Sequence, residues 1–348
     1  MKQETQMFCG DSAVELLKIK DNSVDMLCSD PPYGYSFMNK GWDQVLPDTE
    51  IWRQSYRVLK PGAFITVMAA PRTDVLWRIS RDLEEAGFDL SFTNIEWVYH
   101  SGFPKATDVS KSLDKRFNAK GEVIGEYENS IPQITPWKDV DRFESKNSIT
   151  APATDVAKKY EGSKAGFQPK PAREIIIVGM KPFSEGSYVD KVLNFEALPD
   201  NVKMTYPLIQ TPKPAKKEKD FGLSGEGKKE TMFCNEDGIK QLGRATLPGN
   251  EHQPKEVQPK KNVHPTVKPI KLMSYLITLF TRPGDWVLDP FGGSGTTGLA
   301  CKLLDRNHIY IDFTEEYYDI AQERLQVSKE DLKKLLKEKI SNGQQELF

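Results

Sequence analysis

Short apolar runs alternate with segments of helical periodicity along much of the chain. The runs are typical of buried strands, and they are Met7–Cys9, Val24–Cys28, Ala63–Met68, Ile95–Tyr99, Glu174–Val178, Trp286–Leu288 and Ile309–Ile311. Apolar residues at helical spacing follow in 51–59, 74–86, 299–304, 316–325 and 331–340. This alternation predicts an α/β fold built on a doubly wound, mostly parallel sheet. We expect the β-branched run at Glu174 to pair with the run at Ile95.

A glycine-rich turn follows one of the last strands. Residues Asp289–Gly298 read D-P-F-G-G-S-G-T-T-G, and Gly293, Gly295 and Gly298 fit the pattern G-x-G-x-x-G. Asp312 closes the next apolar run about 20 residues on, where an acid can hold ribose hydroxyls. The pattern predicts a nucleotide-binding turn and leaves a dinucleotide and S-adenosylmethionine both open. It excludes a Walker loop, because no Gly-Lys-Ser/Thr follows the glycines.

A second polar loop follows a strand in the N-terminal half. Asp30-Pro31-Pro32-Tyr33 comes directly after the run that ends near Cys28. Two successive prolines stop the strand and stiffen the loop, so Asp30 and Tyr33 should be held at the rim of the sheet, where ligands bind in open α/β folds. A plain strand-terminating turn is the alternative interpretation.

Composition adds the class of protein and a candidate binding surface. The chain has 348 residues, 28% charged and 38% hydrophobic, which is ordinary for a globular protein with a large core. The formal net charge of −2 conceals an asymmetry, because residues 201–270 hold 13 Lys/Arg against 8 Asp/Glu. A nucleic-acid face is expected in that basic stretch.

Cysteine usage and the N-terminus bear on location. Four cysteines lack C-x-x-C spacing, the first residues lack an apolar signal core, and no apolar run is long enough to span a bilayer. These features predict a cytoplasmic protein with reduced thiols. Cys234, His252 and His264 are too scattered to predict a zinc site, and we expect no metal.

The two loops together identify a family resemblance. D-P-P-Y at Asp30, with D-P-F-G-G-S-G-T-T at Asp289, resembles the S-adenosylmethionine-dependent DNA amino-methyltransferases that modify N6 of adenine or N4 of cytosine. Further similar motifs are Gly10-Asp11-Ser12, Val58-Leu-Lys-Pro-Gly62 and His264-Pro-Thr-Val-Lys-Pro269. Their order resembles the permuted β group, in which the catalytic loop precedes the cofactor loop. The resemblance covers roughly residues 6–103 and 262–326, and it implies the seven-stranded methyltransferase sheet in circularly permuted order.

The resemblance also implies roles for individual residues. The Asp30 carboxylate and the Pro31 carbonyl would accept the N–H bonds of the target amino group, beside Pro32, while Tyr33 would stack on a base flipped out of double-stranded DNA. The implied S-adenosylmethionine site contains Asp11, Thr266, Lys268, Asp289, Phe291, Gly292, Gly293, Gly295, Thr296 and Asp312. In this family Asp11 approaches the cofactor adenine, and Thr266 and Lys268 face its methionine end. Asp11 as a helix cap and Phe291 as a core residue are the simpler alternatives.

Several functions compete. N6-adenine methylation is the main interpretation, because N4-cytosine enzymes more often carry Ser before the two prolines. Protein-glutamine and ribosomal-RNA methyltransferases more typically have Asn at this position. An NAD-dependent oxidoreductase would leave D-P-P-Y unexplained. An inactive DNA-binding protein is a further alternative, but the two intact motifs argue against it. Methylation at cytosine C5 is disfavoured because the chain has no Pro-Cys dipeptide.

The predicted organisation assigns each stretch a part. It comprises 1–103, the N-terminal half of the catalytic domain; 104–172, a variable insertion; 173–183, a returning core strand; 184–262, a basic target-recognition region; 263–326, the C-terminal half; and 327–348, a terminal helix and tail. Lys213, Lys216, Lys217 and Lys219 are predicted to contact DNA phosphates. The recognition sequence, a homodimer through the terminal helix, a cognate restriction endonuclease, and a bacterial or phage-infected host stay open.

Overall fold

A computed structural model describes residues 3–34, 46–99, 107–126, 148–165, 173–183, 208–224 and 261–341. The chain divides into two compact units, one of residues 1–99 and 173–335 and the other of residues 100–172 and 336–348. Cys234, His252 and much of the basic stretch lie outside the described residues.

The larger unit is built on an eight-stranded sheet in the order β1-β12-β11-β2-β3-β9-β4-β10. The strands are β1 (Thr5–Cys9), β2 (Val24–Ser29), β3 (Leu59–Ala69), β4 (Ile95–Val98), β9 (Arg173–Met180), β10 (Leu208–Gln210), β11 (Trp286–Asp289) and β12 (Asn307–Asp312). All pairings are parallel except those of β9, which runs antiparallel to both β3 and β4. The predicted pairing of the runs at Glu174 and Ile95 is confirmed.

The sheet joins strands from both ends of the chain. Strand β2 lies between β11 and β3, so the strand before D-P-P-Y is hydrogen-bonded to the strand before the glycine-rich turn. The short edge strand β10 is one strand more than the seven expected, and it comes from the stretch predicted to be a basic target-recognition region. A strand of three residues is too short to show an alternating apolar and polar pattern in the sequence.

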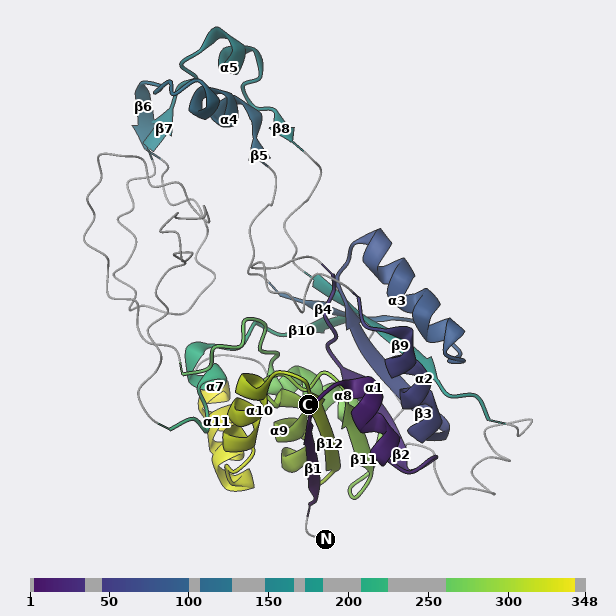
Figure 1. Cartoon of the computed structure of the whole chain (residues 1–348). Helices are drawn as coiled ribbons and strands as arrows, with labels where there is room; N and C mark the ends of the chain where they lie inside the picture. Colours follow the sequence, from purple (N-terminus) through teal and green to yellow (C-terminus); the bar gives the residue numbers. More distant parts are fainter. Residues whose placement is uncertain are drawn as a thin grey trace. The chain divides into compact units, whose positions relative to one another are not determined.

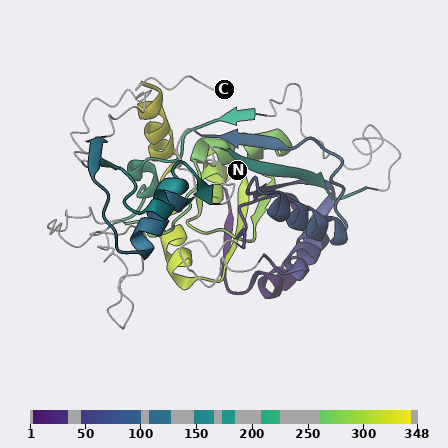
Figure 2. The same ribbon diagram turned by 90° about the horizontal axis from the view of Figure 1, so that it is seen from above.

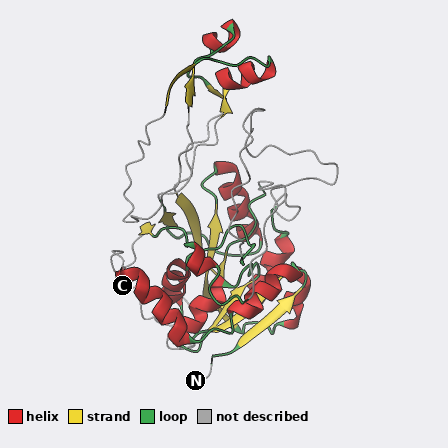
Figure 3. Ribbon diagram, turned by 90° about the vertical axis from the view of Figure 1, so that its left-hand side faces the viewer, coloured by secondary structure: helices red, strands yellow, loops and turns green. Residues whose placement is uncertain are grey.

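Helices cover both faces of the sheet, as Figures 2 and 3 show. The helices α1 (Ser12–Glu15), α2 (Thr49–Val58) and α3 (Thr73–Glu85) lie with one core, and α8 (Ile270–Phe280) and α9 (Thr296–Leu303) lie with the other. Two further helices follow, α10 (Glu315–Arg324) and α11 (Lys329–Ser341), and α10 packs on β1 and β12 (Figure 1). The helices α2, α3, α9, α10 and α11 match predicted segments to within a few residues, whereas α8 was not predicted.

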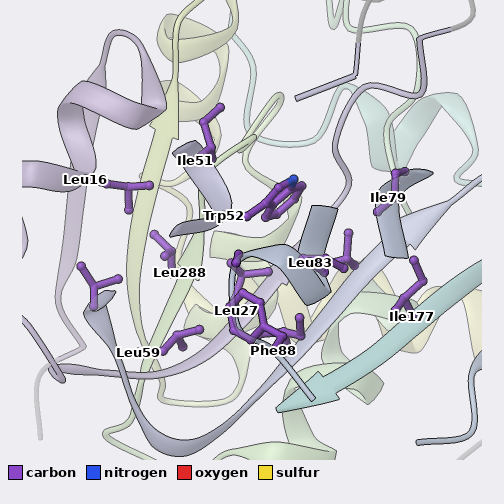
Figure 4. Close-up of a cluster of buried hydrophobic side chains, with 14 of the residues drawn as sticks. Leu16, Leu27, Ile51, Trp52, Leu59, Ile79, Leu83, Phe88, Ile177 and Leu288 are labelled. Atoms are coloured by element: carbon purple, nitrogen blue, oxygen red, sulfur yellow. The ribbon is translucent and has the colours of Figure 1, made fainter. Parts of the chain in front are cut away.

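Successive side chains along each strand point to opposite faces of the sheet, so each strand contributes to two separate cores. Leu27, Ile65 and Ile177 point into the core beneath α2 and α3, where Trp52 is fully buried (Figure 4). Their neighbours Met26 and Cys28 belong to the opposite core. Because both faces of the sheet are buried, the strands read as continuous apolar runs rather than alternating ones.

The described residues of the smaller unit between 107 and 165 form two short antiparallel sheets of two strands each and two helices. Its elements are β5 (Thr107–Asp108), α4 (Val109–Arg116), β6 (Val123–Glu126), β7 (Ser148–Thr150), α5 (Asp155–Lys159) and β8 (Lys164–Ala165), and β5 pairs with β8 while β6 pairs with β7. Asp114 is its central polar residue, since its carboxylate accepts hydrogen bonds from the backbone of Ala153 and Thr154 and from the Thr154 hydroxyl. Folded structure in this stretch was missed by sequence patterning, because its apolar residues are few and widely spaced.

Candidate active site at the carboxyl edge of the sheet

Four aspartates that the sequence predicts at strand ends meet at one edge of the sheet. Strands β1, β2, β11 and β12 are parallel, so Asp11, Asp30, Asp289 and Asp312 all follow or close strands at that edge. Open α/β proteins bind ligands at the carboxyl ends of their strands. Neighbouring loops turn there to opposite faces of the sheet and leave a crevice between them.

The glycine-rich turn has the backbone that its sequence predicts. Gly293 and Gly295 have φ values of +50° and +77°, a region that side chains disfavour. A Cβ on Gly293 would lie 2.7 Å from His264 Nε2, and one on Gly292 would lie 2.2 Å from the Tyr310 ring. The turn is therefore pressed against its neighbours, and only glycine fits at these two places.

Asp312 is tied to this turn. Its carboxylate accepts hydrogen bonds from the backbone N–H of Gly293 at 2.8 Å and of Thr314 at 2.8 Å, and its carbonyl accepts one from Gly10. Burial raises the pKa of Asp312, and these backbone hydrogen bonds oppose the rise. A carboxylate can accept about four hydrogen bonds, so capacity remains for ribose hydroxyls.

Asp289 connects the turn to the D-P-P-Y loop. Its carboxylate accepts hydrogen bonds from the Ser29 hydroxyl and the Thr297 hydroxyl, both at 2.5 Å, and from the Phe291 backbone at 3.2 Å. Burial raises its pKa to about 6, against the lowering effect of these hydrogen bonds. Ser29 directly precedes Asp30, so the two predicted loops share one buried polar contact.

The other residues of the predicted cofactor site have mixed surroundings. Asp11 caps α1 by accepting a hydrogen bond from the Ala13 backbone, and the Ser12 hydroxyl donates to the Pro290 carbonyl at 2.6 Å. The Phe291 ring lies 5.6 Å from that of Trp52 and packs against the core. Thr266 is exposed, and Thr296 begins α9.

The D-P-P-Y loop forms a charged cluster with two residues from other strands and loops. The Tyr33 hydroxyl donates to Asp30 Oδ1 at 2.6 Å, and the Lys268 ammonium contacts Asp30 Oδ2. Lys268 Nζ also lies 3.6 Å from Glu174 Oε2, and its side chain is only 8% exposed. Burial alone would lower the pKa of Lys268, but Asp30 and Glu174 outweigh burial and raise it, so the ammonium stays charged.

Glu174 was missed as a site residue by sequence reasoning. It lies at the start of β9, and because that strand is antiparallel, its first residues reach the edge where the parallel strands end. The only available signal was an acid at the start of an otherwise apolar, β-branched run.

The lysine run has two different environments. Lys213 follows β10, and its ammonium lies 4.3 Å from the centre of the Tyr99 ring, beside the charged cluster. Lys216, Lys217 and Lys219 form the short helix α7 (Lys216–Lys219), which is anchored by the buried Glu218, whose carboxylate accepts the backbone N–H of Ile270. The run is therefore held against the larger unit.

A buried arginine links α7 to the glycine-rich turn. The Arg324 guanidinium donates to the Ser294 carbonyl at 2.5 Å and to the Glu218 carbonyl at 3.2 Å.

Among the described residues, no group of three His, Cys, Asp or Glu side chains is placed to hold a metal ion. Nor does the described part of the chain contain a helix long and apolar enough to cross a membrane.

Comparisons with known proteins agree with this arrangement. Residues 24–323 match the DNA methylase family model for N6 and N4 methylation. The chain is 50% identical over 331 residues to Type II methyltransferase M.HpaI of Haemophilus parainfluenzae, covering 92% of this chain and 74% of that enzyme. It is 46% identical over 76 residues to Type II methyltransferase M2.DpnII of Streptococcus pneumoniae, a match that spans only 28% of that relative's length.

Among solved structures, the PvuII DNA methyltransferase (cytosine-N4-specific) aligns with a TM-score of 0.49 and 18% identity, over 99% of this chain and 95% of that one. The family match covers most of the chain and includes both loops at the carboxyl edge. The protein belongs to the N6/N4 DNA methylase family.

Proposed function

We propose that this protein transfers a methyl group to the exocyclic N6 of an adenine flipped out of double-stranded DNA at a specific sequence. The observation that carries the proposal is the contact between Ser29 and Asp289, because it fixes the D-P-P-Y loop beside the glycine-rich turn. Two loops from opposite ends of the chain then form a single site, as a reaction between a cofactor and a base requires.

The turn suits S-adenosylmethionine. Its glycines leave backbone open where a side chain would collide, and Asp312 offers a carboxylate beside it. Asp11, Thr266, Lys268, Asp289, Phe291, Gly292, Gly295 and Thr296 are the other residues that would hold the cofactor. When bound, S-adenosylmethionine supplies an activated methyl group.

Asp30 and Pro31 would prepare the amino group. The lone pair of an exocyclic amino nitrogen is delocalised into the base ring, so the nitrogen is a poor nucleophile. Hydrogen bonds from its two N–H groups to the Asp30 carboxylate and the Pro31 carbonyl favour a tetrahedral nitrogen and stabilise its developing positive charge. Pro32 stiffens the loop, and Tyr33 offers a ring for stacking.

The choice of adenine rests on Asp30, since Ser is more common at this position in N4-cytosine enzymes. The test is to express the chain in a bacterial strain without other DNA methyltransferases and to map modified bases by sequencing. We expect N6-methyladenine at one recurring sequence. N4-methylcytosine instead would move the assignment to the alternative, and unmodified DNA would refute the proposal.

DNA contact is assigned to the basic segment. Lys213, Lys216, Lys217 and Lys219 are proposed to meet phosphates, and their support is the docking of α7 on the larger unit through Glu218. A cognate restriction endonuclease and a homodimer stay predictions.

A further inference from the structure

Glu174 is a second carboxylate in the D-P-P-Y cluster. Its side chain is 13% exposed. Its Oε2 atom lies 3.3 Å from the Tyr33 hydroxyl and 3.6 Å from Lys268 Nζ, while its Oε1 atom accepts a hydrogen bond from Tyr99 at 3.5 Å. The two groups that contact Asp30 are therefore the same two that reach Glu174.

Both oxygens of the Asp30 carboxylate already have a donor in this arrangement. Tyr33 donates to one of its oxygens and Lys268 contacts the other. A base amino group that donates an N–H to Asp30 competes with these two donors, and the Lys268 ammonium offsets the negative charge of Asp30. Because Lys268 is buried and charged, its displacement without a new acceptor would be strongly unfavourable.

We propose that Glu174 is a positioning residue that takes over the Lys268 ammonium and the Tyr33 hydroxyl when the target amino group binds Asp30. The inference rests on the proposed function, in which Asp30 faces the amino group. Both donors already lie within 3.6 Å of Glu174, so small side-chain movements complete the exchange.

Charge explains why a carboxylate is needed there. Asp30, Glu174 and Lys268 together have a formal charge of −1. Once Lys268 pairs with Glu174, Asp30 is left as an unpaired carboxylate facing the nitrogen on which positive charge develops. Without Glu174, Lys268 would remain on Asp30 and cancel that charge.

The test compares Glu174→Gln with Glu96→Gln, a matched control that removes a carboxylate from the neighbouring strand, where Glu96 pairs with Arg173 near the surface. Glu174→Gln should lower the single-turnover rate of methyl transfer about 10- to 100-fold, the effect of losing a hydrogen-bonded charge. Cofactor affinity, measured by calorimetry, should change less than about twofold. Glu96→Gln should leave both quantities unchanged.

A binding measurement separates this role from a structural one. The affinity of the protein is measured for two target duplexes that differ only at the methylated position. One duplex has adenine there, and the other has purine, which lacks the amino group. Glu174→Gln should weaken binding of the adenine duplex relative to the purine duplex, whereas general disruption would weaken both equally. Glu174→Asp, which keeps the charge, should recover part of the preference.

An unchanged adenine-to-purine ratio in Glu174→Gln overturns the inference. So does loss of cofactor binding in both Glu174→Gln and Glu174→Asp, which would make Glu174 part of the framework. Failure of the proposed function is distinguishable, because the wild-type protein itself would then place no methyl group on adenine.

Discussion

The Ser29 hydroxyl donates a hydrogen bond of 2.5 Å to the buried carboxylate of Asp289, joining residues 260 positions apart in the chain. Burial raises the pKa of Asp289 to about 6, and the Ser29 hydrogen bond counteracts the rise. The folded protein therefore binds a proton here more tightly than the unfolded chain does. The stability that this group contributes is full below about pH 4 and is lost as pH rises through about 6.

The same titration should control cofactor binding. S-adenosylmethionine carries positive charge, so it should bind more tightly as Asp289 ionises between about pH 5 and 7. Ser29→Ala removes a hydrogen bond that lowers the pKa of Asp289, and it should move the midpoint of this dependence to higher pH. Calorimetric titrations across the range measure both. A midpoint that moves to lower pH in Ser29→Ala would contradict the assignment.

The glycine-rich turn can be tested with a matched pair of substitutions. Gly293 and Gly284 both have positive φ, but a Cβ on Gly293 would meet His264 at 2.7 Å whereas one on Gly284 meets nothing within 4 Å. Both Gly→Ala variants should lose about 1 kcal/mol of stability from backbone strain, and Gly293→Ala should lose more because its Cβ meets His264. Only Gly293→Ala should also lose most of its cofactor affinity. Equal cofactor affinities would show that the turn does not hold the cofactor.

The DNA-binding assignment is tested by two lysine pairs. Lys216 and Lys217 are exposed on α7, and Lys158 and Lys159 are exposed on α5 of the smaller unit. Changing the α7 pair to Ala should weaken binding to all sequences alike. It should also flatten the log-log salt dependence by up to about one unit for each phosphate that the protein no longer neutralises. If only the α5 pair has this effect, the phosphate-binding surface lies in the smaller unit.

Much of this architecture could be predicted because apolar runs and turn residues are local signals. The run before Asp30 and the run before Asp289 are both predicted as strands, and the structure sets them side by side. Glu174 could not be found in that way. Its place in the site depends on the antiparallel direction of β9, which no local pattern encodes.

The basic stretch shows a second limit of sequence reasoning. Its composition predicts a charged surface, but the buried contacts of Glu218 with the α8 backbone and of Arg324 with Ser294 connect segments that are distant in sequence. A buried charged residue looks the same in the sequence as an exposed one. The docking of α7 was therefore accessible only from the structure.

Asp30 is proposed to act on the base and not on the cofactor, and this division of roles is central to the proposed mechanism. Methyl transfer to DNA and calorimetric binding of S-adenosylmethionine should be measured on Asp30→Ala, with Asp74→Ala as a control at an exposed carboxylate on α3 that pairs with Arg72. We predict that Asp30→Ala abolishes methyl transfer and leaves cofactor affinity nearly intact, while Asp74→Ala changes neither. Wild-type turnover in Asp30→Ala would contradict this assignment.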